Sequence, residues 1–243
     1  DITELFITGA ARPHLDLRAL LCGQFPELEK WRADAELRVA DAPRLLSVFH
    51  FNAPDEEHWP TEAAFEKGGL SVSDAMLAER IAAVSPDDIA MIIFSSGTTA
   101  QPKACMISHG VVSEVAGAIA ERLELVADDV FWGPLPWSHL STPLPLNACR
   151  QVGATFVCQS PRQAGPALEE LERTGATICY SPFPARTAGL IDHRDFKGRD
   201  LSRLRLMINI GAPDLLRKFA EAIPQATQIG CYGLTESGGI STM

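Results

Sequence analysis

The sequence lacks any long hydrophobic run, because none of its apolar stretches approaches the roughly 18 to 20 residues that a membrane-spanning helix needs. Its first residues, DITELFITGA, also lack the basic segment and the following apolar stretch that are typical of a secretory signal peptide. These two absences argue against a membrane or secreted protein. We therefore expect a cytoplasmic protein without a membrane span.

Closely spaced cysteines are absent as well. No two of the six cysteines have the spacing of a zinc knuckle or a redox motif, and most of them sit in apolar, strand-like runs. We interpret them as buried, reduced thiols, with disulfides or metal ligands as the alternative. The six are Cys22, Cys105, Cys149, Cys158, Cys179 and Cys231.

An excess of basic charge is also missing. The chain has 31 acidic and 21 basic residues, which gives a net charge of -10. Nucleic-acid surfaces usually carry clustered Lys and Arg, so we expect no nucleic-acid partner. A local loop can nevertheless bind a phosphate on a chain of net negative charge. A hydrophobic content of 46% with 21% charged residues is typical of an ordinary globular protein.

Short apolar runs alternate with amphipathic stretches along the chain, the pattern of parallel strands joined by helices. This pattern predicts an α/β fold of mostly parallel sheets flanked by helices in layers. The predicted strands are Leu5 to Thr8, Leu45 to His50, Ala90 to Phe94, Val130 to Leu135, Ala154 to Cys158, Ala176 to Tyr180, Leu204 to Asn209 and Thr227 to Gly230.

Three helices have recognisable ends. Ser108 can cap one of them, a second runs from Pro166 and stops near Gly175, and a third begins at Pro213. The polar, proline-bearing segment 52–67 is interpreted as a surface connection.

The most informative stretch is 92–109, which reads IIFSSGTTAQPKACMISH. An apolar strand leads into a cluster of small and hydroxyl-bearing residues, and a lysine follows. Small residues let backbone N–H groups approach phosphate oxygens, while hydroxyls and an ammonium group add further donors. The GxxxxGK[ST] spacing of a P-loop is absent. The stretch therefore indicates either a polyphosphate site or a solvated turn between a strand and a helix. The residues concerned are Ser95, Ser96, Gly97, Thr98, Thr99 and Lys103.

From Phe94 to Lys103 the sequence FSSGTTAQPK resembles the signature loop of the adenylate-forming superfamily. This superfamily includes acyl-CoA ligases, luciferases and the adenylation domains of peptide synthetases. The resemblance implies that Ser95, Ser96, Thr98, Thr99 and Lys103 bind the β- and γ-phosphates of ATP. Two alanines, Ala100 and Ala104, stand where glycine is usual, and either would cost about 1 kcal/mol if its backbone needed a positive φ.

A second motif, YGLTES, covers Tyr232 to Ser237. By itself it is compatible with an ordinary polar turn. In the superfamily the matching threonine contacts the α-phosphate and the glutamate coordinates Mg²⁺, so the resemblance assigns these roles to Thr235 and Glu236. Tyr232 and Gly233 are included in the implied nucleotide site.

A third segment, Ile210-Gly211-Ala212-Pro213, resembles the Gly-Gly-Ala-Pro stretch that packs against adenine. Isoleucine at position 210 departs from that pattern. The same segment is also compatible with a strand-to-helix turn that has proline at the first helical position. The two interpretations can hold together.

A fourth segment, Leu135-Pro136-Trp137-Ser138-His139, resembles a Leu-Pro-x-x-His block in which the histidine stands near the acyl substrate. A structural role for His139 is the alternative. The run ATICYSPFPAR, residues 176–186, occupies the place of a strand and turn that line the acyl pocket in relatives. Tyr180 and Phe183 are thus candidates for pocket walls or for ordinary core residues.

The implied reaction is the ATP-dependent activation of a carboxylic acid as an acyl-adenylate, followed by transfer to coenzyme A. It requires ATP and Mg²⁺, with coenzyme A as co-substrate, and Lys103, His139, Thr235 and Glu236 as the catalytic set. One alternative is an adenylation domain that loads a carrier protein. Another is a non-catalytic nucleotide-binding protein that retains the fold, an interpretation that the departures at positions 100, 104 and 210 favour.

The resemblance implies that residues 1–243 form part of an N-terminal domain, with two possible subdomains at 1–85 and 86–243. Relatives continue into a mobile C-terminal domain with a lysine that promotes adenylation, and this region has no counterpart in the sequence. We expect such a fragment to bind ATP weakly and to adenylate poorly by itself.

Overall fold

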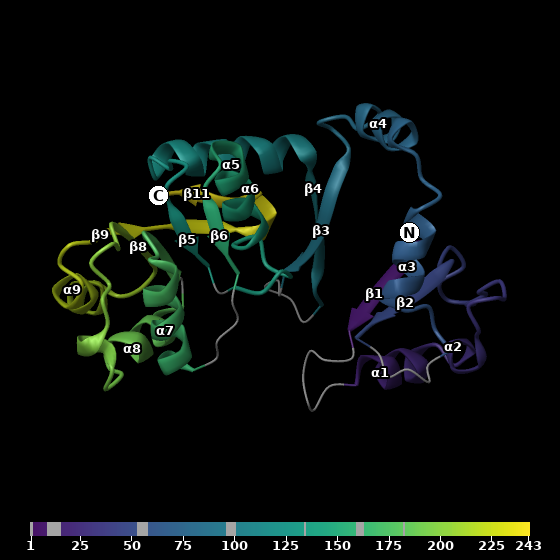
Figure 1. Cartoon of the computed structure of the whole chain (residues 1–243), viewed down its shortest axis with the longest axis horizontal. Coiled ribbons are helices and arrows are strands. Elements are labelled where there is room, and N and C mark those ends of the chain that lie inside the picture. The colour runs from purple at the N-terminus through teal and green to yellow at the C-terminus, as the bar shows by residue number, and fades with distance from the viewer. Residues whose placement is uncertain are drawn as a thin grey trace. The chain divides into compact units, whose positions relative to one another are not determined.

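A computed structural model describes residues 2–8, 16–52, 58–95, 101–133, 135–158, 163–181 and 183–243 (Figure 1). The chain folds as two compact units, Asp1–Val84 and Ser85–Met243. In the described residues, no helix combines the length and the apolar character needed to cross a membrane.

The first unit is built around a parallel pair of strands, β1 (Glu4–Thr8) and β2 (Ser47–Phe51). Its core includes Trp59, whose indole N–H donates to the carbonyl of Leu28 at 3.1 Å. Helix α3 overlaps the segment 52–67, so the interpretation of that segment as a connection is wrong for residues 62–67. All side chains of this helix stay partly or fully exposed, which explains its polar sequence. The helices are α1 (Leu17–Gln24), α2 (Glu27–Lys30), α3 (Glu62–Gly69) and α4 (Asp74–Ala82).

The second unit contains a parallel sheet of five strands in the order β6-β5-β7-β8-β9. The predicted α/β fold with a parallel sheet is confirmed. Each strand lies within a predicted apolar run or extends one residue beyond it. The strands are β5 (Val130–Trp132), β6 (Thr155–Val157), β7 (Ile178–Ser181), β8 (Leu206–Asn209) and β9 (Thr227–Gly230).

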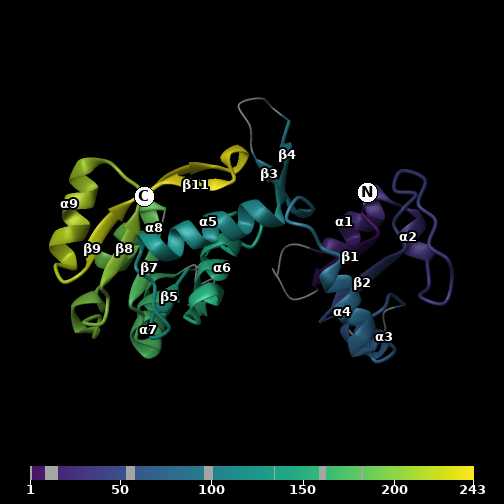
Figure 2. The same cartoon turned by 90° about the horizontal axis from the view of Figure 1, so that it is seen from above.

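Helices cover both faces of this sheet (Figures 1 and 2). Alternate residues of β7 show the two layers, because Ile178 and Tyr180 pack in the core beside α5 and α6 whereas Cys179 packs in the core beside α7 and α8. The predicted cap is confirmed, since the hydroxyl of Ser108 accepts from the N–H of Val111. The helices are α5 (His109–Arg122), α6 (Pro143–Val152), α7 (Ala164–Thr174), α8 (Pro184–Ile191) and α9 (Pro213–Ala222).

Two antiparallel hairpins complete the second unit: β3 (Ile89–Ser95) with β4 (Lys103–Ser108), and β10 (Tyr232–Leu234) with β11 (Gly239–Thr242). The sequence analysis missed β4 and both strands of the second hairpin. Because Ala104 lies opposite Phe94 in the β3–β4 ladder, its backbone is extended and no positive φ arises there.

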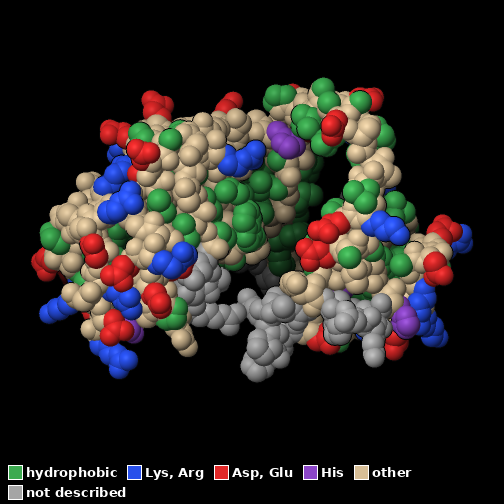
Figure 3. All heavy atoms as spheres, viewed as in Figure 1, with side chains coloured by type: hydrophobic (Ala, Val, Ile, Leu, Met, Phe, Trp, Pro, Cys, Tyr) green, Lys and Arg blue, Asp and Glu red, His purple; other side chains and the backbone are tan. Residues whose placement is uncertain are grey.

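The outward face of the β3–β4 hairpin is apolar. Ile92, Phe94 and Met106 are 49%, 67% and 68% exposed, and Ile92 pairs directly with Met106 across the two strands. Figure 3 shows hydrophobic side chains along this hairpin, while acidic and basic side chains are interspersed over the outer surface of the unit.

All six cysteines are free, as predicted, but their burial varies. Cys149 and Cys179 are buried, whereas Cys158 is exposed, so the prediction of burial is wrong for Cys158. Cys158 directly follows the short strand β6 at the edge of the sheet, where fewer elements cover a side chain.

Candidate active site

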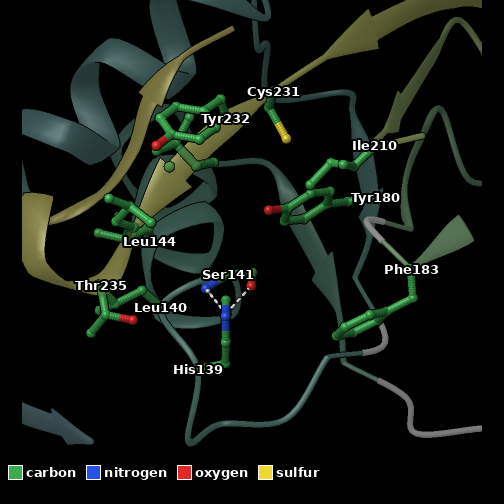
Figure 4. A pocket seen from close by; sticks show the side chains of 14 residues that line it. His139, Leu140, Ser141, Leu144, Tyr180, Phe183, Ile210, Cys231, Tyr232 and Thr235 are labelled. Atoms are coloured by element: carbon green, nitrogen blue, oxygen red, sulfur yellow. Dashed lines mark hydrogen bonds between the residues drawn. The ribbon is translucent and has the colours of Figure 1, made fainter. Parts of the chain in front are cut away.

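A pocket of about 190 Å³ lies at the carboxyl ends of the parallel strands. Strand β5 is followed by α6 on one face of the sheet, and its neighbour β7 is followed by α8 on the other. Where the connections after two adjacent strands pass to opposite faces of the sheet, a crevice opens between them. Ligands of open α/β sheets bind in this crevice. The pocket is lined by residues that follow β5, β7, β8 and β9, including His139, Phe183, Ile210 and Thr235 (Figure 4).

His139 is placed by the loop between β5 and α6. The hydroxyl of Thr142 donates to the carbonyls of Leu135 and Pro136 at 2.9 and 3.1 Å, and the N–H of His139 donates to Pro136 at 3.1 Å. On the ring itself, Nδ1 receives the N–H of Ser141 at 3.1 Å and also contacts the hydroxyl of Ser141. Partial desolvation of the ring lowers the pKa of His139, although the residue as a whole is exposed, so the imidazole is neutral at pH 7.

The turn between β10 and β11 holds Thr235 and Glu236 in a short 3-10 helix, η2 (Thr235–Ser237). The hydroxyl of Ser237 fixes this turn, because it accepts from the N–H of Leu234 at 3.3 Å and donates to the carbonyl of Leu234 at 3.0 Å. Gly233 has a structural reason to be glycine: a Cβ there would lie 2.0 Å from the backbone oxygen of Gly239.

The end of β3 meets this turn. The hydroxyl of Ser95 donates to a carboxylate oxygen of Glu236 at 2.7 Å, although the two residues are 141 positions apart. Lys103 lies directly opposite Ser95 in the β3–β4 ladder. The hydrogen bond from Ser95 lowers the pKa of Glu236, and bonding to the backbone and the charge of Lys103 act in the same direction. The carboxylate is therefore ionised at neutral pH. A hydroxyl thus contacts a carboxylate here, and a lysine lies on the neighbouring strand beside them.

The remaining residues of the predicted phosphate loop, Ser96, Gly97, Thr98 and Thr99, lie outside the described residues, as does Ala100. Ser95, directly before this stretch, contacts Glu236, and Lys103 after it lies opposite Ser95 in the ladder.

The segment predicted to pack against adenine forms the turn between β8 and α9. Pro213 is the first residue of α9 and Ala212 is its N-cap residue. Ile210 lines the pocket, but Gly211 and the two residues after it do not contribute to its lining. Tyr232, Gly233 and Thr235 do line it.

Tyr180 and Phe183 both line the pocket, as predicted for its walls. Several lining residues were not anticipated, namely Ser141, Leu144, Cys231 and Ile240. Two of them had a usable signal in the sequence, because Ser141 follows His139 by two positions and Cys231 directly precedes the YGLTES motif. Leu144 and Ile240 had none, because only the packing of α6 against β11 brings them to the pocket.

The chain is similar to several known enzymes. It is 31% identical to 4-coumarate-CoA ligase 1 of Narcissus pseudonarcissus over 169 residues, which cover 66% of the chain and 30% of that protein. It is 27% identical to the mitochondrial medium-chain acyl-CoA ligase ACSF2 of Rattus norvegicus over 232 residues, covering 90% of the chain and 37% of that protein. The crystal structure of a long-chain-fatty-acid-CoA ligase (FadD1) from Archaeoglobus fulgidus superposes with a TM-score of 0.70 at 18% identity, covering 98% of the chain and 43% of that structure.

In each of these comparisons the chain spans less than half the length of its relative. The sequence pattern of the family described as AMP-binding enzyme matches residues 14–243, which is nearly the whole chain. The chain belongs to the AMP-binding enzyme family.

Proposed function

We propose that this chain forms the nucleotide- and acyl-binding part of an ATP-dependent acyl-CoA ligase. The observation that supports this most directly is the hydrogen bond between Ser95 and Glu236, because it joins the first residue of the Ser/Thr-rich segment 95–99 to the YGLTES turn. In this proposal residues 1–243 are part of an N-terminal domain. The acceptor is coenzyme A, since the relatives named above are CoA ligases.

The nucleotide would lie with its triphosphate along the junction of β3, β4 and η2. Ser95 and Lys103 then bind the β- and γ-phosphates, together with the hydroxyls of residues 96–99, and Thr235 binds the α-phosphate. The acid carboxylate forms a bond to the α-phosphorus, and the bond to the pyrophosphate oxygen breaks, with pyrophosphate keeping the electron pair. In such a reaction the protein mainly positions groups and neutralises charge.

Magnesium fits the residues at this junction. No cluster of three or more His, Cys, Asp or Glu occurs in the part of the chain that the structure describes, so Glu236 is the only carboxylate proposed as a ligand. Mg²⁺ is commonly bound by one or two carboxylates together with substrate phosphates and waters, which suits a single ionised carboxylate beside a triphosphate. The bound ion would offset the negative charge of the nucleotide and of the departing pyrophosphate.

The acid would occupy the pocket beside His139. Leu140 and Leu144 are 2% and 0% exposed, and with Ile210 and Phe183 they give the pocket an apolar lining. At its rim the pocket reaches Thr235, the residue proposed for the α-phosphate. The carboxyl group and the reacting phosphorus can thus meet at the pocket mouth. A cytoplasmic location stays a prediction of the sequence.

Binding of a non-reactive acyl-adenylate analogue tests this arrangement. An aromatic acyl-sulfamoyl adenosine should bind the chain at least about tenfold more tightly than AMP, because its acyl group gains apolar contacts. Phe183→Ala, which removes an apolar wall of the pocket outside the segments proposed for the nucleotide, should reduce that gain and leave AMP affinity unchanged. Equal affinity for the analogue and AMP in the wild-type chain would favour a nucleotide-binding protein that does not take an acid.

A further inference from the structure

One wall of the pocket is polar, and three separate parts of the chain build it. His139 and Ser141 come from the loop before α6, Tyr180 from β7, and Cys231 from the residue after β9. Figure 4 shows the hydroxyl of Tyr180 pointing into the space that these residues surround. Because Ser141 and Tyr180 are only 5% and 3% exposed, their polar groups must find partners within the wall.

Ser141 directs two groups at one ring nitrogen of His139. Its backbone N–H lies 3.1 Å from Nδ1, and its hydroxyl oxygen also contacts Nδ1. A backbone amide can only donate, so Nδ1 must offer its lone pair and carries no proton. The hydroxyl of Ser141 consequently acts as a donor too. In a neutral imidazole the remaining proton then lies on Nε2.

The surroundings keep this ring neutral. Burial lowers the pKa of His139 and raises the pKa of Tyr180 and of Cys231, so the phenol and the thiol also stay uncharged. Tyr180 and Cys231 line the pocket beside Ser141 and form the rest of this wall. Among the described residues that line the pocket, none carries a charge that would favour an imidazolium.

We propose that Ser141 is a positioning residue, which fixes the Nε2–H tautomer of His139 and makes the imidazole a hydrogen-bond donor to the carboxyl group of the acid. This rests on the proposed function, since it assumes that the acid occupies the pocket. Nε2 has no hydrogen-bond partner within the described part of the chain and is available to a ligand.

The role proposed for His139 is that of a donor and not of a base. The acid reacts as a carboxylate, so no proton has to be removed from it when its oxygen bonds to phosphorus. An N–H from a neutral ring can align that carboxylate without the strong ion pair that an imidazolium would form, which would hold back the attacking oxygen. The proton stays on Nε2 throughout the step.

Nitrogen NMR measures the tautomer directly. The chain is labelled with ¹⁵N-histidine, and the signals of His139 among the six histidines are identified by their loss in a His139→Gln variant. In the wild type we expect a protonated Nε2 and an unprotonated Nδ1 at pH 7. In Ser141→Ala the backbone N–H still faces Nδ1, so the Nε2–H tautomer should persist, whereas the pKa of His139 should rise because the neutral ring loses the hydrogen bond from the hydroxyl. A protonated Nδ1 in the wild type would overturn the proposal.

Two variants serve as controls. Ser138→Ala removes an exposed serine of the same loop and should change neither the tautomer nor the pKa. Ser141→Thr keeps the hydroxyl and should retain the wild-type pattern. If Ser141→Ala does not fold, Ser141→Cys keeps a side chain of similar size but donates weakly, and it should show the same change. A folded Ser141→Ala or Ser141→Cys variant in which His139 keeps the pKa of the wild type would also overturn the proposal.

Binding of the acyl-adenylate analogue, measured on the same samples, separates this proposal from the proposed function. Loss of one well-placed hydrogen bond should lower the affinity of Ser141→Ala for the analogue about fivefold and leave its affinity for AMP unchanged. Unchanged analogue affinity in a variant in which the pKa of His139 has risen would contradict the positioning role of Ser141. If the wild-type chain does not bind the analogue, the proposed function fails, whatever the tautomer shows.

Discussion

Replacing Asp129 should lower the free energy of unfolding more than most substitutions outside the pocket, and the structure allows the size of this effect to be worked out. The residue is 2% exposed, and its carboxylate accepts from Arg205 at 2.6 and 2.9 Å and from the hydroxyl of Thr177 at 2.7 Å. A fourth bond comes from the N–H of Val126 at 3.0 Å. Asp129, Thr177 and Arg205 directly precede β5, β7 and β8, so one carboxylate ties the amino ends of these three strands together, opposite the carboxyl ends that form the pocket.

Asp129→Ala leaves the guanidinium of Arg205 beside an unfilled space. Breaking a buried ion pair by removing one partner typically costs about 3 to 5 kcal/mol. The side chain of Arg205 is 35% exposed and keeps bonds to the carbonyls of Leu123 and Glu124 at 3.1 Å, which places the cost near the lower end. We expect a loss of about 3 kcal/mol in the free energy of unfolding. For a chain of this size that lowers Tm by about 6 to 12 °C.

Thermal and urea unfolding followed by circular dichroism measure this loss. The matched control is Asp192→Ala in the same unit, where an aspartate pairs with Lys218 at 2.8 Å but both side chains are about half exposed. Exposed pairs contribute less than about 1 kcal/mol, so Tm should fall only slightly. Equal effects of the two substitutions would refute the reasoning that burial makes the Asp129 cluster important.

The same cluster predicts how stability depends on pH. Burial alone would raise the pKa of Asp129, but hydrogen bonds from Arg205, Thr177 and Val126 outweigh it and lower the pKa below the ordinary value. A carboxyl group whose pKa is lower in the folded state stabilises the fold above the unfolded value of about 3.9, and this contribution is lost as the pH falls through the folded value. Asp129→Asn should therefore flatten the loss of stability below about pH 4. If Asp129→Asn instead lost stability with falling pH as steeply as the wild type, other carboxyl groups would control the pH dependence.

Two further predictions concern the backbone conformation of a glycine and the reactivity of the cysteines. Gly239 has a φ of +114°, and a Cβ there would lie 2.3 Å from Cδ1 of Leu144, so Gly239→Ala should lower the free energy of unfolding by about 2 kcal/mol or more. Gly230→Ala is the control, because nothing lies near the added atom, and it should lower the free energy of unfolding by less than about 1 kcal/mol. Similar urea midpoints for the two variants would contradict this prediction. Mass spectrometry after brief alkylation should find Cys158 modified first, because it is exposed, whereas burial raises the pKa of Cys179 to about 12. Early labelling of Cys179 in the folded chain would be inconsistent with its position in the sheet.

The parallel sheet could be predicted from the sequence because its strands β7 and β8 are largely apolar runs that are buried along their whole length. β7 is the clearest case, since all four of its residues are buried. β4 could not, because KACMIS begins and ends with polar residues and its identity as a strand depends on pairing with β3. The sequence likewise hid α6, whose first turn PLP is typical of a loop, although proline is tolerated there because those N–H groups need no partner within the helix.

The candidate site also has parts that the sequence predicts and parts that it does not. Residues within one motif, such as Thr235 and Glu236, could be grouped from the sequence because they are neighbours. Contacts between distant segments could not: Asp129 meets Thr177 and Arg205 across 48 and 76 positions, and only the fold brings them together. The family resemblance implied that Ser95 and Glu236 serve one nucleotide, but their direct contact across 141 positions comes from the structure.

The central claim is that Lys103 and Glu236 bind one nucleotide and its metal ion, and calorimetry with ATP in the presence of Mg²⁺ tests it most directly. The wild-type chain should bind, and Lys103→Ala and Glu236→Ala should each weaken binding by about tenfold, as expected for loss of a charged contact. Lys197→Ala, which removes an exposed lysine of another turn, should bind like the wild type. Unchanged affinity in both Lys103→Ala and Glu236→Ala would contradict the account.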